Sequence, residues 1–462
     1  MSATSTIDIS GLRERVRAQV VTDTDPEYNN ARAVHNGMID KHPLAIVRVS
    51  QVADVLETVA WARDAGVDLA IRGGGHSGAG LGTVDGGIVL DFSLRRGVRV
   101  DARRQTARAE AGTTWGDFNY ATHPFGLATP GGIVGSTGIA GLTLGGGIGY
   151  LTRKYGLSCD NLVSADVVTA DGRLVTASAT ENDDLFWALR GGGGNFGVVT
   201  SFEYTVHPVD SVYCGIIVYS IDDSERAGRF YRDYLAQAPE DFGAYFGYHL
   251  GPLADYLPER YHGVPACMIV GAWFGDPSEG EARWRPLLDA APVLGSRIVQ
   301  VPYPELNAMF DASQPKGIYS YWKSDFVDSL SDDVLRVGAD FGSRVPTIQT
   351  ATNFHPLDGA VHRVASDATA FAYRTVGFSP AIAAFWTDPA DSEANIAWTR
   401  EFWTALHPYG SGGGYINFMG ADDGVRAVDN YGPNWARLRE VKAKWDPDNV
   451  FHVNQNIPPA EH

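Results

Sequence analysis

Asp68-Leu-Ala-Ile-Arg72-Gly-Gly-Gly-His76-Ser-Gly78 is the most informative stretch of the 462-residue chain. It carries the spacing Gly-x-Gly-x-x-Gly directly after an apolar run, as in the dinucleotide-binding βαβ unit. That unit needs a helix to begin at the third glycine, so that the helix N-terminus faces a pyrophosphate. Residues 79–85 instead contain two further glycines and no helical periodicity, and residues 86–91 are strand-like. We therefore predict a strand, a glycine loop and a second strand, which argues against a Rossmann turn.

Such a loop can still present consecutive backbone N–H groups to an anion, because glycine allows close approach of the backbone. His76 is the only titratable side chain in it, and a solvent-exposed loop histidine is the ordinary interpretation. Two more glycine runs follow, at residues 131–149 and 190–197. Three runs beside strands in one region indicate a long ligand with several polar parts, and a dinucleotide cofactor fits that description.

The composition excludes several classes of protein. A net charge of −18 argues against nucleic-acid binding, which depends on clusters of Lys and Arg. Cys159, Cys214 and Cys267 are too few and too scattered for a disulfide framework or a zinc site, so we expect no metal. We expect no signal peptide, and the sequence contains no 18-residue apolar stretch. We expect a cytoplasmic protein without membrane contact, as a monomer or a homodimer.

The composition and the pattern of the sequence change near residue 210. Before it, short β-branched runs alternate with glycines; after it, aromatic residues increase and strands alternate with helices. The strand candidates there are Tyr213–Tyr219, Ala244–Leu250, Cys267–Phe274, Thr347–Asn353 and Ala381–Phe385. This pattern predicts an α+β protein with a first domain over 1–207 and a second over 208–412. The second would hold one antiparallel sheet covered by helices on one face, and a tail, 413–462, would return to the first.

Several motifs, in an unbroken order, resemble one family. In the first domain they are Arg72–Ser77, Gly86–Asp91, Gly145–Gly149, Arg153–Leu157 and Asp184–Gly197; in the tail they are Tyr415–Asn417, Lys442–Phe451 and Asn454–Ile457. The first set is similar to the PCMH-type FAD-binding domain of vanillyl-alcohol-oxidase-type flavoproteins. The tail resembles that of berberine-bridge-enzyme-like proteins, and the likeness is closest to their bacterial members.

This resemblance implies a two-domain flavoprotein with covalently bound FAD. His76 would carry the bond to the 8α-methyl group of the flavin. Val134 stands where doubly attached members have a cysteine, so a single attachment is implied. The implied cofactor-binding residues are Arg72, Gly73, Gly74, Gly75, His76, Ser77, Gly132, Thr137, Gly138, Gly141, Gly146, Gly149, Asn195, Gly197, Val198, Tyr415, Asn417 and Asn454.

The residue at position 137 bears on whether the reduced flavin reacts with O2, and here it is Thr137. In the family a bulky leucine at this position is associated with poor use of O2, and Thr137 is smaller, which favours an oxidase over a dehydrogenase. The chain departs from the family elsewhere. Gly78 stands at a position often held by tyrosine, and Ala381 stands where a side-chain base is expected. The base that hydride transfer needs must come from another residue or be absent.

Two pairs of residues are candidates for catalysis. Tyr415 could be the base if nearby cations lowered its pKa, although a packed aromatic residue is an equal interpretation. Asn417, two residues on, would share its face of a strand. Asn353 and His355 share a face in the same way, and His355 could be a base near neutral pH.

Aromatic residues at 319–322 could also line the substrate pocket. Tyr319, Tyr321 and Trp322 lie close together in the sequence, but aromatic residues in a core are commoner than those in a site. We interpret them as mostly structural.

These features predict an FAD-dependent oxidase that takes a hydride from a small alcohol, amine, or phenolic or polyketide-like metabolite and passes electrons to O2, giving H2O2. A flavin dehydrogenase with another acceptor is one alternative. A non-catalytic flavin- or ligand-binding protein is another, motivated by the missing base. A nicotinamide dehydrogenase is disfavoured, because no helix is expected after the glycine loop.

Overall fold

The loop that contains His76 joins two neighbouring parallel strands. A computed structural model describes residues 8–461, and in it β3 (Leu69–Arg72) and β4 (Ile88–Asp91) pair with Arg72 opposite Asp91. The segment between them has turns and bends but no helix. The predicted strand, loop and strand are confirmed.

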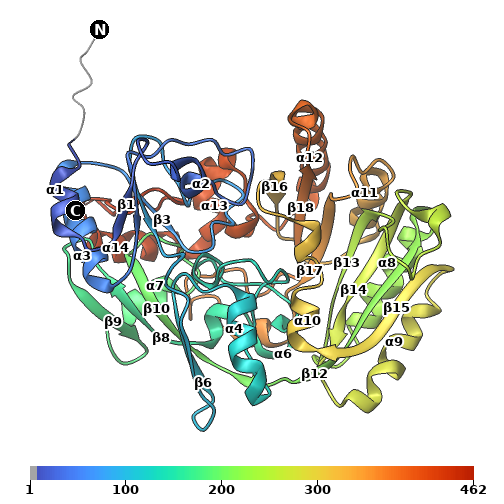
Figure 1. The fold of residues 1–462 in the computed structure, drawn as a ribbon. Coiled ribbons are helices and arrows are strands. Elements are labelled where there is room, and N and C mark those ends of the chain that lie inside the picture. The colour runs from blue at the N-terminus through green and yellow to red at the C-terminus, as the bar shows by residue number, and fades with distance from the viewer. Residues whose placement is uncertain (1–7, 462) are drawn as a thin grey trace.

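Two sheets form the part of the structure that precedes residue 206 (Figure 1). The first has the order β1 (Gln19–Val21), β2 (Ala45–Arg48), β4, β3, and the second has the order β5 (Val98–Asp101), β6 (Thr106–Glu110), β10 (Val198–Thr205), β8 (Leu162–Val168), β9 (Leu174–Ser178). Their helices are α1 (Ser10–Arg15), α2 (Tyr28–Arg32), α3 (Val52–Ala65), α4 (Trp115–Thr122), α5 (Ile139–Leu144), α6 (Thr152–Tyr155) and α7 (Asp183–Leu189). β7 (Leu127–Ala128) pairs with β11 (His207–Pro208).

A single seven-stranded sheet forms the second half, and all its pairings are antiparallel. Its order is β15 (Val293–Pro302), β12 (Ser211–Ser220), β14 (Pro265–Trp273), β13 (Phe242–Leu250), β17 (Ala351–Pro356), β18 (Phe378–Trp386), β16 (Tyr319–Ser324). One face packs on α8 (Ser224–Leu235), α9 (Gly280–Leu288), α11 (Asp332–Gly342) and α12 (Ser392–Leu406). The other face packs partly on Tyr150 and Leu151 of the first half. The expected α+β class, with a helix-covered antiparallel sheet, is confirmed.

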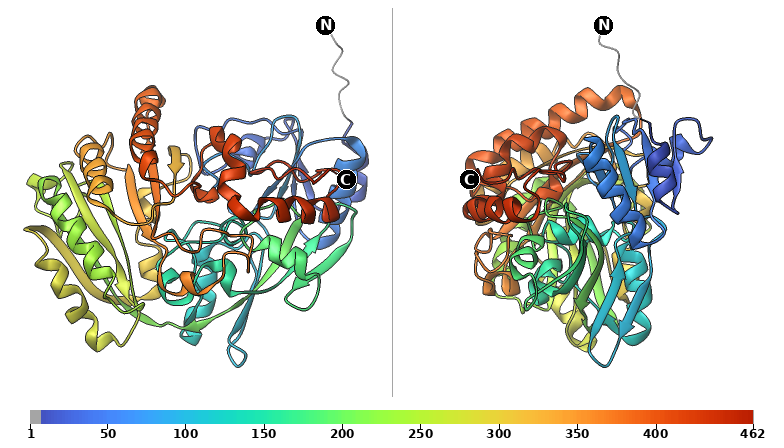
Figure 2. Two further views of the ribbon diagram at one scale, coloured as in Figure 1. Left: turned by 180° about the vertical axis from the view of Figure 1, so that it is seen from behind. Right: turned by 90° about the vertical axis from the view of Figure 1, so that its left-hand side faces the viewer.

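The C-terminal segment crosses back to the N-terminal half. Its helices α13 (Ala427–Tyr431) and α14 (Trp435–Trp445) lie beside the N-terminal elements in the views of Figure 2. Leu438, Trp445 and Ile457 are buried in the same apolar cluster as α3 and α7. Within residues 8–461, none of the helices has the length and apolar character needed to cross a bilayer.

Candidate active site

The imidazole of His76 lines a deep cavity between the two halves of the molecule. Its ring stacks on that of His35, with centroids 3.9 Å apart, and its Nδ1 is 3.4 Å from the hydroxyl of Thr137. Burial, with a smaller contribution from His35, lowers the pKa of His76 to about 3. The ring is therefore neutral at neutral pH and keeps a lone pair on one nitrogen, which a nucleophile needs.

Most of the predicted cofactor residues meet at this cavity. Those that line it are Arg72, Gly73, Gly74, Gly75, His76, Ser77, Gly132, Thr137, Gly138, Gly141, Gly197, Tyr415, Asn417 and Asn454. Asn353 and His355 line it from the seven-stranded sheet. Residues from three glycine runs, the tail and the second sheet thus surround one space.

Four predicted cofactor contacts lie outside the lining and have structural roles instead. A Cβ on Gly149 would lie 1.6 Å from the carbonyl oxygen of Gly131, and Gly146 packs on Phe371. Val198 points into the core because side chains on a strand alternate, which brings its neighbour Val199 to the cavity.

The fourth is Asn195, which ties its loop to the tail. Its Nδ2 donates to the carbonyl oxygens of Gly192 and Gln455, and its Oδ1 accepts from the backbone N–H of Ile457. The side-chain amide of Asn195 is therefore hydrogen-bonded to other parts of the protein.

Arg72 lines the cavity, but its charge is already paired. Its guanidinium is 3.1 Å from the carboxylate of Asp91 and also donates to the carbonyl of Ala31. It is the only Lys, Arg, Asp or Glu in the cavity lining of the described residues. A bound phosphate would therefore be met mainly by backbone N–H groups of the glycine loops.

The cavity fits a long ligand with polar groups. A Cβ on Gly141 or Gly194 would meet no protein atom within 4 Å, so both glycines leave open space along the lining. Asn454 and Gln455, also on the lining, each have a buried side-chain oxygen with no hydrogen-bond partner in the described residues. Buried polar atoms are seldom left unpaired. The open glycines and free acceptors suit FAD, which is long and carries hydroxyl and amino donors.

The hydroxyl of Tyr415 accepts hydrogen bonds, and its surroundings do not activate it as a base. Its hydroxyl accepts from the backbone N–H groups of Gly147 and Ile148 and from Nδ2 of Asn417, at 2.9, 3.3 and 2.8 Å. Burial raises the pKa of Tyr415, and no cation contributes to the shift. The lowered pKa expected from the sequence is corrected. Asn417 reaches Tyr415 through the 3₁₀ turn Ile416–Phe418, not along a strand as expected.

His355 is a better-placed candidate for a base. It is 4% exposed, and no hydrogen bond joins its ring to the rest of residues 8–461. Burial lowers its pKa to about 4, so the ring is neutral at neutral pH. Asn353, on the same face of β17, accepts from Nε2 of His249 at 2.9 Å, and its Nδ2 is free of protein partners in the described part.

Aromatic residues surround the substrate side of the cavity, and the interpretation of Trp322 as mostly structural is corrected. Trp322, Phe385 and Phe418 line it, whereas Tyr319 and Tyr321 face away. The alternation along β16 (Tyr319–Ser324) explains this division. Residues 319–324 are not among the strands expected from the sequence, so the period of two that separates Trp322 from its neighbours is seen only in the structure. No signal in the sequence placed His35 beside His76.

Comparison with known proteins identifies the family. Residues 43–178 match the model of the FAD binding domain, and residues 414–458 match the model described as berberine and berberine like. The FAD-linked oxidoreductase YgaK of Bacillus subtilis is 32% identical over 97% of this chain and 98% of its own. The chain belongs to the berberine-bridge-enzyme-like family. It is an FAD-linked oxidoreductase.

Other members of the berberine-bridge-enzyme-like family agree over nearly the full length. (R)-6-hydroxynicotine oxidase of Paenarthrobacter nicotinovorans is 29% identical over 96% of this chain and 97% of its own. The crystal structure of 6-hydroxy-D-nicotine oxidase from Arthrobacter nicotinovorans superposes with a TM-score of 0.84 at 26% identity, covering 96% of this chain and 98% of that one. BBE-like 1 of Physcomitrella patens gives 0.85 at 25% identity, with 98% and 99% covered. The expected family and two-domain fold are confirmed.

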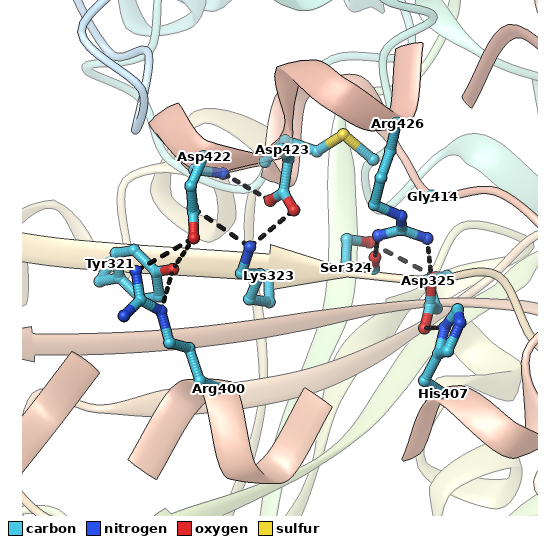
Figure 3. A network of polar contacts seen from close by, with 12 residues as sticks. Tyr321, Lys323, Ser324, Asp325, Arg400, His407, Gly414, Asp422, Asp423 and Arg426 are labelled. Atoms are coloured by element: carbon cyan, nitrogen blue, oxygen red, sulfur yellow. Dashed lines mark hydrogen bonds and ion pairs between the residues drawn. The ribbon is translucent and has the colours of Figure 1, made fainter. Parts of the chain in front are cut away.

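The tail that characterises berberine-bridge-like proteins is fastened to the second sheet by buried charges (Figure 3). Nζ of Lys323 is 2.6 Å from Asp423, and Nη2 of Arg426 is 2.6 Å from Asp325. Asp325 is also 2.8 Å from Nδ1 of His407. These contacts fix the segment that follows Tyr415 and so hold the 3₁₀ turn against the cavity.

Proposed function

We propose that this protein is an oxidase that holds FAD covalently through His76. It takes a hydride from a small alcohol, amine, or phenolic or polyketide-like metabolite and passes the electrons to O2. The observation that most supports this proposal is the position of two neutral histidines on one cavity. His76 lies on the loop of the first half, and His355 lies on the second sheet. His76 is suited to forming the covalent bond to the flavin, and His355 is suited to accepting a proton.

The substrate loses two hydrogens, and the side chains of this protein handle the one that leaves as a proton. When bound, FAD would supply the acceptor for the hydride. The unprotonated nitrogen of His355 would take the O–H or N–H proton as the hydride leaves the adjoining carbon. Asn353 would orient the substrate through its free Nδ2. In total the substrate gains a C=O or C=N bond, and O2 takes up both electrons and both protons as H2O2.

A single attachment through His76 agrees with the positions of the cysteines. Val134 lines the cavity where a second link would need a thiol, whereas Cys159, Cys214 and Cys267 are buried and lie outside the lining. In forming the tether, the N–H of the imidazole and one C–H of the flavin methyl group would be lost, and O2 would accept both hydrogens as H2O2. The neutral state of His76 supports its role as the nucleophile.

The use of O2 is tested by rapid mixing of the reduced holoenzyme with oxygenated buffer. Thr137 lines the cavity beside His76 and leaves more room there than leucine would. We expect reoxidation to be faster than that of free reduced flavin, with H2O2 as the product, and to slow in Thr137→Leu but not in Thr137→Ser. Reoxidation no faster than that of free flavin would favour another electron acceptor. A flavin that no substrate reduces in the absence of O2 would favour a binding protein.

A further inference from the structure

The substrate side of the cavity is formed by one face of three neighbouring strands. The cavity-lining residues on it are Ser320 and Trp322 of β16, Ala381, Ala383 and Phe385 of β18, and Ala351, Asn353 and His355 of β17. In the register of the sheet, Trp322, Ala383 and Ala351 lie side by side. The alanines make a low apolar floor beside a tall indole.

The indole of Trp322 is held in place by several contacts. Its Nε1 donates to the hydroxyl of Ser320 at 3.1 Å. Its ring stacks on Phe418, with centroids 5.8 Å apart and planes inclined by 19°, and meets Phe385 edge-on at 5.2 Å. Phe418 also reaches toward His355, with centroids 5.6 Å apart. Aromatic rings therefore extend from Trp322 to the neutral imidazole.

Gly78 provides the space that this indole occupies. A Cβ on Gly78 would lie 2.7 Å from Cδ1 of Trp322, which is closer than carbon atoms can approach. Because Gly78, two residues after His76, has no side chain, the indole of Trp322 on β16 can lie against its backbone. A tyrosine at 78 and an indole in this position exclude each other. The pair fixes the shape of the cavity on its substrate side.

The same region offers no partner for a charged substrate. Arg72 is the only permanently charged residue of the lining in the described part, and Asp91 neutralises it. Burying an ion without a partner costs several kcal/mol. Few polar groups are free for a sugar either, because Ser320 is bonded to Trp322 and the amide of Asn36 is bonded to Gly78 and Ser320.

We propose that the substrate is an uncharged aromatic compound whose ring packs on Trp322 above the alanine floor, and that the Gly78–Trp322 pair determines this specificity. The oxidisable group would reach His355 and Asn353, which is the part of the proposal that rests on the proposed function. Selection would come from apolar and aromatic packing together with the exclusion of ions.

Binding of two unreactive probes to the FAD-loaded protein tests the proposal by calorimetry. 4-Methoxybenzamide is neutral, 4-methoxybenzoate has nearly the same shape with a negative charge, and neither has a hydrogen on the carbonyl carbon. We expect the amide to bind at least about tenfold more tightly than the carboxylate. Equal affinities, or tighter binding of the carboxylate, would overturn the proposal.

Matched variants locate the binding site. Trp322→Ala should weaken amide binding at least about tenfold, since stacking and apolar burial are lost. Gly78→Ala should weaken it too, because the new methyl group must displace the indole. Tyr319→Phe is the control: Tyr319 lies on the same strand, faces away from the cavity and packs on Trp386. Unchanged amide binding in both Trp322→Ala and Gly78→Ala, with FAD content retained, would refute the assignment.

These measurements need no turnover, so they separate the two proposals. In one outcome, amide binding depends on Trp322, but neither 4-methoxybenzyl alcohol nor other aromatic alcohols and amines reduce the flavin. This result would support the aromatic ligand class and count against the oxidase. Reduction by cellobiose without amide binding would support the oxidase and overturn the aromatic specificity.

Discussion

The imidazole rings of His35 and His76 stack with their centroids 3.9 Å apart and their planes inclined by 27°. His35 is itself fixed, since its backbone N–H donates to the carbonyl of Gly75 and its Nε2 lies 3.0 Å from the carbonyl of Gln314. Burial lowers the pKa of both rings, so neither carries a charge that would repel the other at neutral pH. The stack orients the proposed tether.

We expect His76→Ala to abolish covalent attachment of the cofactor. No other side chain that lines the cavity combines a neutral nucleophilic nitrogen with a place in the glycine loop. Acid precipitation should leave the flavin in the supernatant, and the mass of the peptide spanning residue 76 should show no FAD adduct. His42→Ala, at an exposed histidine, should keep the adduct. An adduct that persists in His76→Ala would show that another residue is the point of attachment.

His35 should affect how fast the adduct forms. Removing its ring in His35→Ala frees His76 to rotate, so we expect incorporation of FAD into the apoprotein to slow about tenfold or more, as misplacement of a reacting group does. His35→Phe keeps an aromatic face and should restore most of the rate. The adduct is followed by mass spectrometry against time. Equal slowing in both variants would show that the ring nitrogens of His35 matter, rather than the stack.

The pH dependence of flavin reduction should report on His355. Its pKa is lowered from 6.5 to about 4, so the ring is a competent base above about pH 4 and loses that capacity as the pH falls through this value. The anaerobic rate of reduction should therefore stay level from pH 7 to 5 and decline below about 4.5. His355→Gln should lower the rate at least about 100-fold. An unchanged rate in His355→Gln would exclude this histidine as the base.

The side chain of His355 also makes the stability of the folded protein depend on pH. Between pH 6.5 and about 4 the unfolded chain binds a proton at His355 that the folded protein does not. The free energy of unfolding therefore falls as the pH drops through this window. His355→Gln should make that decline shallower in thermal unfolding.

Tyr415→Phe distinguishes the two candidate bases. Loss of its hydroxyl leaves the N–H of Gly147 without an acceptor, and Nδ2 of Asn417 keeps only the carbonyl of Leu142, so we expect a loss of stability of about 1–3 kcal/mol. If His355 is the base, the rate of flavin reduction should fall less than about tenfold. A fall of at least about 100-fold, with FAD still bound, would return the role to Tyr415.

Much of the fold could be predicted because its patterns are local. The strand expected at Tyr213–Tyr219 lies within β12 (Ser211–Ser220), and the glycines between β3 and β4 exclude a helix there. The edge strand Val293–Pro302 was missed because it is half-buried on both faces and shows no alternation. The strand expected from 347 begins at 351, since Thr347 and Thr350 bond to each other in a turn.

The candidate site was predictable only where a motif carried it. The loop around His76 was found in this way, and the cavity gathers around it. Contacts between distant segments left no local signal: Phe418 meets Trp322 from the tail, and Trp322 fills the space at Gly78. Val198 was assigned to the cavity in place of Val199, because a motif names a segment without saying which face of the strand points inward.

The ion pairs in Figure 3 should differ in their effect on stability according to burial. The side chains of Lys323 and Asp423 are 7% and 2% exposed, whereas those of Arg400 and Asp422 are 55% and 41% exposed. Lys323→Met leaves a buried carboxylate without its cation, at a cost of about 3–5 kcal/mol, which corresponds to a melting temperature roughly 10 °C lower. Arg400→Ala removes an exposed pair worth about 0–1 kcal/mol and should shift it by no more than about 3 °C.

The double variant Lys323→Met with Asp423→Asn shows whether the uncompensated charge is the cause. The asparagine is neutral and can still accept the backbone N–H of Gly420, as Asp423 does at 3.0 Å. We therefore expect the double variant to melt well above Lys323→Met alone. Circular dichroism of the FAD-loaded proteins measures this. If Lys323→Met melts no lower than Arg400→Ala, the buried pair does not fasten the tail to the sheet, and the packing of Phe418 on Trp322 must hold the turn against the cavity instead.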